Sequence, residues 1–364
     1  MLEIELLRVA LGSLQSLSRI PSEKEWRDLY AFAVSHSLVG LFFGGIEKLP
    51  QEQAPDRELL LRWLGQAMIQ RRQKAFFDSV MAEVTQVLTR ENVRLVVFKG
   101  LAVASRYPEP SLRTMGDIDF YVPSSDFDRA VEVVEKNICR IDEKDCIDKH
   151  FAFEWKGVRF EMHYQMETFG FGGHQRYYGA LVDAAVENGR VDHFLAGGVE
   201  IPMLPVELDL IQVFKHWMTH LIGEGIGLRQ TTDIAVLVDS YRKTVDIASL
   251  KGHLTRIGYL RAFDAVVMMV EKYYAITWPE YWNERNSKCS LTRENAGRFA
   301  DLLMKDILRN GNFGRSDYKH AKGLAKRLET LKRFCNHCIR YFRLAPKEIL
   351  FLIPKRILIS LKAH

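Results

Sequence analysis

The stretch VRLVVFKGLAVASRYPEPSLRTMGDIDFYV, residues 93–122, contains the pattern that decides the fold. It opens with a short apolar and β-branched run, Val93–Phe98, which predicts a buried strand. Lys99-Gly100 ends this run, and the next residues fit a short helix that stops before two prolines. Asp117–Val122 then predicts a second strand. The succession of strand, turn, helix and strand is typical of a small α/β unit.

Two further strands are predicted downstream of this unit. They span Phe151–Trp155 and Val158–Tyr164, and Lys156-Gly157 between them is a hairpin turn signal. Before and after the strands, apolar residues recur at helical intervals. We therefore expect an α+β protein with a small mixed-sheet core flanked by helices. Its expected parts are an N-terminal helical region, the α/β core, and a C-terminal helical domain with a basic tail: residues 1–92, 93–204 and 205–364.

The composition is that of a folded globular protein. Of the 364 residues, 47% are hydrophobic and 27% are charged. The net charge of +5 is unevenly placed, because 11 Lys and Arg stand against 2 Glu from position 321 onward. This tail therefore carries +9 and leaves −4 for residues 1–320. Since the basic charge is confined to the tail, the sequence argues against nucleic acid as the main partner.

Targeting signals are not evident in the sequence. The N-terminus is amphipathic and lacks the pattern of a signal peptide, and no stretch reaches the roughly 18–20 apolar residues of a spanning helix. We therefore expect a cytoplasmic location. The five cysteines have no framework spacing, which fits reduced thiols. Cys335, His337 and Cys338 resemble half of a zinc site, but residues three apart share a helix face anyway, so packing is their expected role.

Asp117 and Asp119 occupy alternate positions of the second predicted strand, so their side chains project from the same face. Two carboxylates placed in this way repel each other, and burying them unpaired is costly. A divalent cation relieves the repulsion, and Mg²⁺ or Mn²⁺ prefers such hard oxygen ligands. The alternative is a solvent-facing strand with two hydrated acids, because short acidic pairs are common.

Other residues near this pair favour a metal and nucleotide site. Gly100 at the start of a helix lets backbone amides approach a phosphate, and Lys99 beside it adds positive charge. Arg113, four residues before Asp117, is a further candidate to neutralise phosphate, unless it pairs with an acid. Glu161 is an acid inside a later apolar strand. A third carboxylate there could ligate an ion and accept the proton of an attacking group.

The stretch at 98–122, continued by FEMHYQM at 160–166, resembles a family of uncharacterised bacterial nucleotidyltransferases within the polymerase-beta-like superfamily. The Lys-Gly turn, the following Tyr-Pro, the Arg before Asp-Ile-Asp and the later acid all have counterparts there. LIQVFKHWMTHLIGEGIGLRQTTDIAVLV, at 210–238, is similar to the family's histidine-containing helix, Gly-rich break and Asp-bearing helix, with Arg229 and Asp233 among its polar members. The resemblance implies catalytic and metal-binding roles for Asp117, Asp119 and Glu161, and nucleotide binding by Lys99, Gly100 and Arg113.

Three histidines are candidates for substrate binding. His163 shares a strand face with the third acid, and it could bind substrate or orient that acid; a half-buried histidine satisfied by a neighbour is the alternative. His216 and His220 stand four apart on one predicted helix face. We expect them to line the cleft, because no Glu lies between them in the metalloprotease arrangement. The aromatic residues at 169–171 and 177–178 are expected to pack as a loop beside the site.

Together these roles predict a Mg-dependent nucleotidyltransferase, in which a hydroxyl acceptor attacks the α-phosphorus of a nucleoside triphosphate and pyrophosphate leaves. A small molecule, a sugar or a protein hydroxyl would all serve as acceptor. One alternative is a non-catalytic nucleotide-binding or partner-binding module of the same fold. Another is peripheral membrane contact through the apolar and basic tail at 343–362, although Pro354 is expected to break that helix and such tails more often pack on their own domain.

Overall fold

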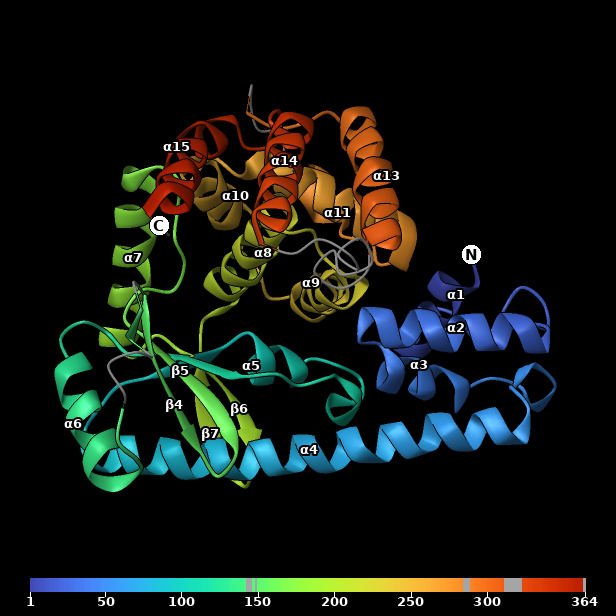
Figure 1. Ribbon diagram of the computed structural model, residues 1–364, viewed down its shortest axis with the longest axis horizontal. Coiled ribbons are helices and arrows are strands. Elements are labelled where there is room, and N and C mark those ends of the chain that lie inside the picture. Colours follow the sequence, from blue (N-terminus) through green and yellow to red (C-terminus); the bar gives the residue numbers. More distant parts are fainter. Residues whose placement is uncertain (142–145, 148, 284–288, 311–322, 363–364) are drawn as a thin grey trace.

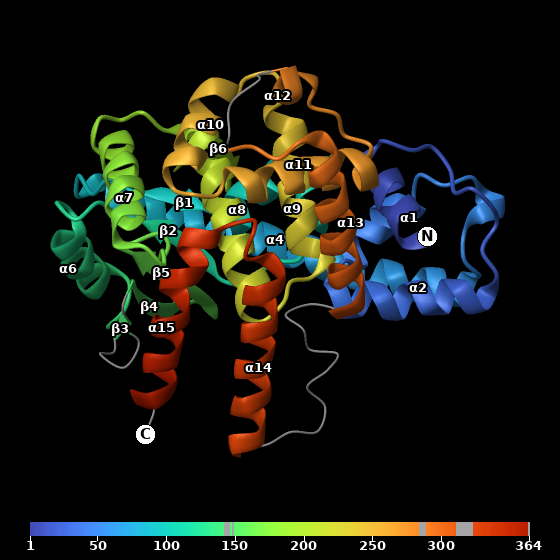
Figure 2. The same ribbon diagram turned by 90° about the horizontal axis from the view of Figure 1, so that it is seen from above.

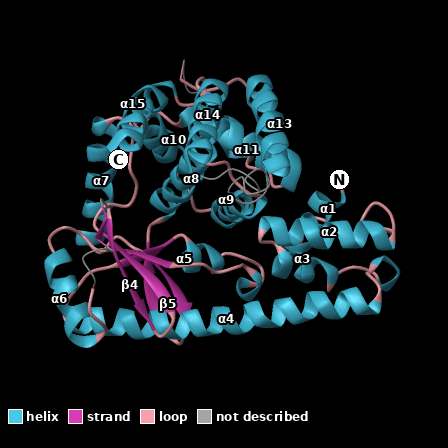
Figure 3. Ribbon diagram, viewed as in Figure 1, coloured by secondary structure: helices cyan, strands magenta, loops and turns pink. Residues whose placement is uncertain are grey.

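The computed structural model confirms the α+β class: helices precede and follow a single mixed sheet along the chain (Figures 1 and 3). The structure describes residues 1–141, 146–147, 149–283, 289–310 and 323–362.

Four α-helices precede the sheet, and the first three lie together at one end of the molecule (Figure 1). The four helices are α1 (Leu2–Leu11), α2 (Glu23–His36), α3 (Val39–Ile46) and α4 (Arg57–Arg90). A capping box between Ser22 and Glu25 fixes the start of α2, because each residue satisfies a backbone N–H of the other. The 34-residue α4 then runs beneath the sheet (Figure 1). Its second half packs Val80, Met81 and Val84 against the sheet.

The sheet has seven strands in the order β3-β4-β5-β2-β1-β7-β6. The pairs β2–β5 and β1–β7 are parallel, and the other neighbouring pairs are antiparallel. The strands are β1 (Val96–Phe98), β2 (Ile118–Tyr121), β3 (Cys146–Ile147), β4 (His150–Trp155), β5 (Val158–His163), β6 (Asp192–Ala196) and β7 (Val199–Met203). The helices between them are α5 (Gly100–Ala104), α6 (Phe127–Asn137) and α7 (Gly172–Glu187).

The two faces of the sheet differ in chemistry because side chains alternate along each strand. On β5, Val158, Phe160 and Met162 are buried in the apolar layer that includes residues of α4 and α6. The residues between them, including Glu161 and His163, face the other side. That side lies toward the C-terminal helices, so the polar positions of the strands are held between the sheet and a helical layer (Figure 1).

The C-terminal layer consists of α8 (Val206–Gly223), α9 (Leu228–Tyr241), α10 (Ile247–Arg256), α11 (Leu260–Tyr274), α12 (Pro279–Asn283), α13 (Arg293–Asn310), α14 (Gly323–Tyr341) and α15 (Pro346–Lys362). Figure 2 shows α14 and α15 extending side by side beyond the body of the protein. The predicted helix break at Pro354 is wrong, because α15 continues through this residue. Proline has no N–H, so the carbonyl of Leu350 lacks its usual helical hydrogen bond. Pro354 and Leu350 are both on the exposed side of α15, where water can bind that carbonyl.

The tail packs on its own protein through a buried acid. Glu348 of α15 is 2% exposed and accepts hydrogen bonds from His174 Nδ1 at 2.5 Å and from the Gly170 amide at 2.6 Å. In α14, Cys338 lies in the apolar core, and burial raises the pKa of its thiol to about 11. A thiol held in this way fits packing rather than metal ligation.

The N-terminal helices share one apolar core with the C-terminal layer. The amide of Leu228, at the start of α9, donates to Nδ1 of His36 in α2 at 3.1 Å, and Ser13 Oγ donates to the carbonyl of Tyr274 at 2.9 Å. Because this core spans the N-terminal and C-terminal helices, the structure does not by itself test the predicted domain boundaries at 92 and 204. Within the described part of the chain, every helix is too short or too polar to cross a membrane.

Candidate active site

Two of the three predicted acids lie side by side in the sheet. The parallel pairing of β2 with β5 sets Asp119 opposite Glu161 and Tyr121 opposite His163. Because the side-chain period of a strand is two, Asp119, Glu161 and His163 all project from the same face. Asp119 is 5% exposed, and His163 is fully buried. Two neighbouring strands of the sheet therefore hold the carboxylates of Asp119 and Glu161 in fixed positions beside each other.

Asp117 lies directly before β2, at the exposed rim of this pair. Partial desolvation by the surrounding protein raises the pKa of Asp117, and the charges of Asp119 and Glu161 raise it further. The three carboxylates are thus close enough to oppose one another's ionisation. A bound cation would remove that penalty.

Lys99 is the cation nearest to the acids. Its Nζ donates to Asp119 Oδ1 at 3.2 Å and lies 3.9 Å from Glu167 Oε1. Burial lowers the pKa of Lys99, but Asp119 and Glu167 outweigh it, so the net shift is upward and the ammonium stays charged. Lys99 has a φ of 56° and a ψ of −135°, a conformation that residues with side chains rarely adopt. The sharp turn from β1 into α5 therefore places this ammonium group.

Gly100 begins α5 as predicted, and the turn is packed tightly against the acidic strand. A Cβ on Gly100 would lie 3.3 Å from the carbonyl oxygen of Asp117, closer than is usual for such a contact. A side chain at this position would therefore push on the segment that carries Asp117. The glycine allows the turn and the acids to approach each other.

The third predicted acid has two histidine neighbours. Glu161 Oε2 lies 3.5 Å from His163 Nε2 and 3.4 Å from His150 Nδ1. Burial raises the pKa of Glu161, but His163 and His150 outweigh it together, and the net shift is downward. A carboxylate that stays ionised in this way is better suited to hold a cation than to accept a proton.

A hydrogen-bonded chain leads from the acids to α8. His216 Nδ1 donates to Glu167 Oε1 at 2.8 Å, and His220 Nε2 lies 3.1 Å from His216 Nε2. Glu167 is 2% exposed. Burial raises its pKa, but His216 and Lys99 lower it far more, so Glu167 is ionised. Burial lowers the pKa of both histidines, that of His220 to about 3, so they are neutral at pH 7.

Arg113 forms a two-bond ion pair with Asp233 of α9. Its Nε and Nη2 donate to the two carboxylate oxygens of Asp233 at 2.7 and 2.8 Å, and Tyr107 also donates to Asp233 at 2.7 Å. Arg229 is only 3.8 Å from Asp233 and its buried Nε lacks a hydrogen-bond partner among the residues that the structure describes. Two guanidinium groups therefore share one carboxylate, which leaves this end of the site positive.

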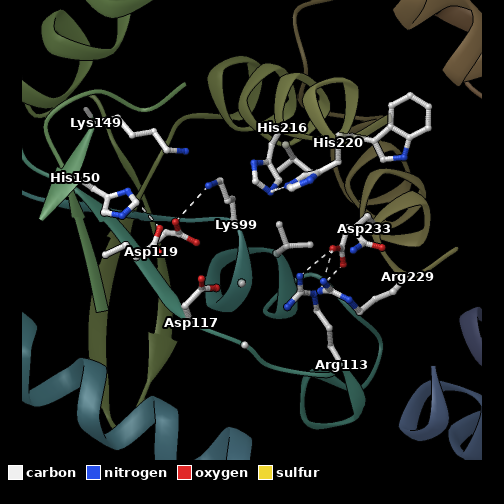
Figure 4. A pocket seen from close by; sticks show the side chains of 17 residues that line it. Lys99, Arg113, Asp117, Asp119, Lys149, His150, His216, His220, Arg229 and Asp233 are labelled. Atoms are coloured by element: carbon white, nitrogen blue, oxygen red, sulfur yellow. Dashed lines mark hydrogen bonds and ion pairs between the residues drawn. The ribbon is translucent and has the colours of Figure 1, made fainter. Parts of the chain in front are cut away.

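Most of these groups line a pocket of about 410 Å³ (Figure 4). In the close-up, Asp117 and Asp119 lie at one end, Arg113, Asp233 and Arg229 lie at the other, and Lys99 points between them. His150 is neutral at pH 7, because burial lowers its pKa to about 4. The charged lining residues therefore balance: the cations are Lys99, Lys149, Arg113 and Arg229, and the acids are Asp117, Asp119, Glu161 and Asp233. A divalent cation would make the pocket positive and suited to an anionic ligand.

The structure brings most of the predicted residues to the pocket wall: Lys99, Gly100, Arg113, Asp117, Asp119, Glu161, His216 and His220. His163 lies behind the wall, where it contacts Asp119. Sequence reasoning missed Glu167, Lys149 and His150. A signal for His150 existed, since counting back from the Lys156-Gly157 turn pairs it with His163.

One comparison with known proteins gives a match that spans the pocket. The family model described as "uncharacterised nucleotidyltransferase" matches residues 22–275, which include every residue of the pocket. Searches of curated proteins and of solved structures found no significant match. Because the matched segment is more than half of the 364 residues, the chain belongs to the uncharacterised nucleotidyltransferase family.

Proposed function

We propose that this protein transfers a nucleoside monophosphate from a nucleoside triphosphate to a hydroxyl-bearing acceptor and releases pyrophosphate. The observation that carries the proposal is the gathering of Asp117, Asp119 and Glu161 beside Lys99 at one end of a pocket whose other end carries Arg113 and Arg229. Desolvation and the neighbouring charges of Asp119 and Glu161 raise the pKa of Asp117, a penalty that a bound cation would relieve. The three acids fit Mg²⁺ or Mn²⁺, which would neutralise the phosphates and polarise the α-phosphorus when bound.

The protein's own groups would position the two reactants. Lys99 and the amides at the Gly100 turn would hold the phosphates, and Lys149 and Arg229 would add positive charge along the pocket. The acceptor oxygen would form a bond to the α-phosphorus while the bond from that phosphorus to the pyrophosphate oxygen breaks. Pyrophosphate leaves with the bonding electrons, and the acceptor's proton passes to solvent or to a nearby base. His216 and His220 on α8 would contact the substrate on the opposite wall.

Replacing Glu161 tests the proposal. We expect Glu161→Gln to keep the fold and most nucleotide affinity but to reduce transfer by about 100-fold or more, the scale of a lost catalytic group. The measurement is pyrophosphate release with labelled nucleoside triphosphates and acceptor fractions from a lysate. Glu154→Gln, at an exposed position of the neighbouring strand β4, is the matched control and should keep the parent rate.

The same experiment separates an enzyme from a binding module. A module that only holds a nucleotide needs acids to neutralise charge, so Glu161→Gln would leave its behaviour almost unchanged. Nucleotide binding without pyrophosphate release in the parent, or equal rates in the parent and the Gln variant, would contradict catalysis by this site.

A further inference from the structure

We propose that His150, Glu161 and His163, together with Asp119, form a site for a first-row transition cation such as Mn²⁺ or Zn²⁺, which binds there in preference to Mg²⁺. The inference rests on the proposed function only in that Asp119 and Glu161 belong to both. It adds an ion of different chemistry and a ligand, His150, that sequence reasoning did not identify.

The pairing of three neighbouring strands builds the site. The β4–β5 hairpin sets His150 opposite His163, and the β2–β5 pair sets Asp119 opposite Glu161. The rings of His150 and His163 have centroids 4.7 Å apart. All four residues therefore belong to hydrogen-bonded strands, and His150 is the first residue of its strand. The sheet, rather than a loop, fixes their relative positions.

The separations of the ligand atoms fit a shared ion. His163 Nε2 lies 2.9 Å from Asp119 Oδ1 and 3.5 Å from Glu161 Oε2, and His150 Nδ1 lies 3.4 Å from the same Glu161 oxygen. One ligand atom from each of His150, Glu161 and His163 lies within 4.8 Å of the others. Ligands about 2.1 Å from an ion are about 3.0–3.4 Å apart at adjacent octahedral or tetrahedral corners.

The buried Nδ1 of His150 points to a missing partner. His150 is 4% exposed, and its Nδ1 has no hydrogen bond to any residue in the described ranges, although a carboxylate oxygen is 3.4 Å away. Buried polar atoms in native proteins are nearly always satisfied. A cation between Nδ1 and the carboxylate would satisfy the nitrogen without requiring it to be protonated.

His163 has the second contact that metal-ligating histidines usually make. Its Nδ1 lies 3.4 Å from the carbonyl oxygen of Gln165. If Nδ1–H donates to that carbonyl, Nε2 presents its lone pair toward Asp119 and Glu161, where a cation would join all three. In the absence of an ion, the same ring can donate from Nε2 to Asp119, so the histidine serves both states.

The ligand set determines which cation is favoured. Imidazole nitrogen suits Zn²⁺ and Fe²⁺, and Mn²⁺ accepts it beside the oxygen ligands that it prefers, whereas Mg²⁺ takes oxygen ligands and retains water. Asp117 lies before β2 at the exposed rim, and the groups that act on its charge are Asp119, Glu161 and Lys99, so it offers oxygen ligands. The pocket therefore has one position with imidazole ligands and one without.

Calorimetry with Mn²⁺ and with Mg²⁺, on the full-length protein without nucleotide, tests the inference. We expect the parent to bind Mn²⁺ at least about tenfold more tightly than Mg²⁺. In His150→Gln the Mn²⁺ affinity should fall by about tenfold or more, as for groups that tune metal sites, while the Mg²⁺ affinity stays within about twofold. His193→Gln, which changes an exposed histidine of β6, is the matched control and should bind both ions as the parent does.

A spectroscopic measurement on the unmodified protein keeps the inference testable if His150→Gln does not fold. Electron spin-echo spectra of the Mn²⁺-loaded parent should show nitrogen couplings from coordinated imidazole. Equal affinities for Mn²⁺ and Mg²⁺, an unchanged Mn²⁺ affinity in folded His150→Gln, or spectra without nitrogen coupling would overturn it. Selective Mn²⁺ binding in a protein that transfers no nucleotide would refute only the proposed function.

Discussion

Lys99 and Asp119 form a buried ion pair at the base of the pocket, with Nζ 3.2 Å from Oδ1 and side chains that are 11% and 7% exposed. If the pocket holds a metal and a triphosphate as proposed, this ammonium group would have two opposing effects. It would compete with the cation for Asp119, and it would attract the phosphates that the cation accompanies.

Replacing this ammonium group should separate the two effects. We expect Lys99→Met to bind Mn²⁺ about tenfold more tightly in the absence of nucleotide, because a nearby positive charge is removed in a weakly screened site. The affinity for a non-hydrolysable triphosphate should fall by about the same factor. Calorimetry measures both, and Lys272→Met, which breaks an exposed pair with Asp301, is the control. Unchanged triphosphate affinity would remove Lys99 from phosphate binding.

The two acids of the Asp-Ile-Asp motif should differ in their effect on stability. Asp117 has a raised pKa, so its ionised form is disfavoured in the folded protein, and Asp117→Asn should raise the metal-free stability at pH 7. Asp119→Asn should lower it, because Lys99 and His163 lose their charged acceptor. Both variants should lose divalent-cation affinity. Urea unfolding with and without Mn²⁺ measures these changes, and equal shifts for the two variants would contradict the assignment.

Arg113 and Arg229, at the end of the pocket away from the acids, should differ in their effects on stability and on triphosphate binding. Arg113 and Asp233 are 5% and 7% exposed, and Arg113→Met leaves the buried carboxylate with only Tyr107 and the 3.8 Å contact to Arg229, so it should cost about 3 kcal/mol of unfolding free energy. Arg229 has only a 3.8 Å contact with Asp233, and Arg229→Gln should cost little stability but weaken triphosphate binding about tenfold. Urea unfolding and nucleotide calorimetry distinguish the two roles. A stable Arg113→Met protein would show that the pair does not hold α9 in place.

His36 predicts an acid-sensitive contact between the N-terminal helices and α9. Burial lowers its pKa to about 4, and its Nδ1 accepts the amide of Leu228. Because the folded pKa lies below the unfolded value of about 6.5, the folded state loses stability as pH falls from 6.5 toward 4. The loss should approach about 3 kcal/mol.

A variant with a non-titrating acceptor isolates this contribution. The amide oxygen of His36→Gln can accept from Leu228 without changing charge. The difference in unfolding free energy between parent and variant should therefore shift in the variant's favour between pH 7 and pH 4.5. If the difference is the same at both pH values, His36 does not carry the acid sensitivity.

Part of the fold followed directly from local patterns in the sequence. The hairpin at Lys156-Gly157 forms as predicted, with both turn residues at positive φ, and strict alternation on β5 puts Glu161 on the polar face. These features depend on neighbouring residues, which is why periodicity and turn chemistry reveal them. The family resemblance was likewise carried by consecutive residues.

Two other elements were missed although their signals are local. The aromatic segment predicted as a loop includes part of helix α7, where Tyr178 packs into the core. The β6–β7 hairpin, with Gly197-Gly198 at its turn, was not identified, although it extends the sheet beside β1.

Part of the site was missed because it depends on distant partners. Glu167 follows β5 in no recognisable motif. It belongs to the site because Lys99 lies 3.9 Å from it and α8 brings His216 to within 2.8 Å of it. Such long-range contacts leave no local pattern.

The arrangement of the pocket has a consequence for synthesis of the chain. The sheet is complete once Met203 has been made, but the helices that cover its polar face, α8 and α9, end only at Tyr241. Until they emerge from the ribosome, the apolar residues of that face, such as Phe98, which is buried in the finished core, lack part of their cover. A nascent chain at this stage exposes apolar surface and is prone to associate with other chains or with chaperones. Truncation after the sheet should thus yield aggregates, and the smallest soluble fragment should extend beyond α9.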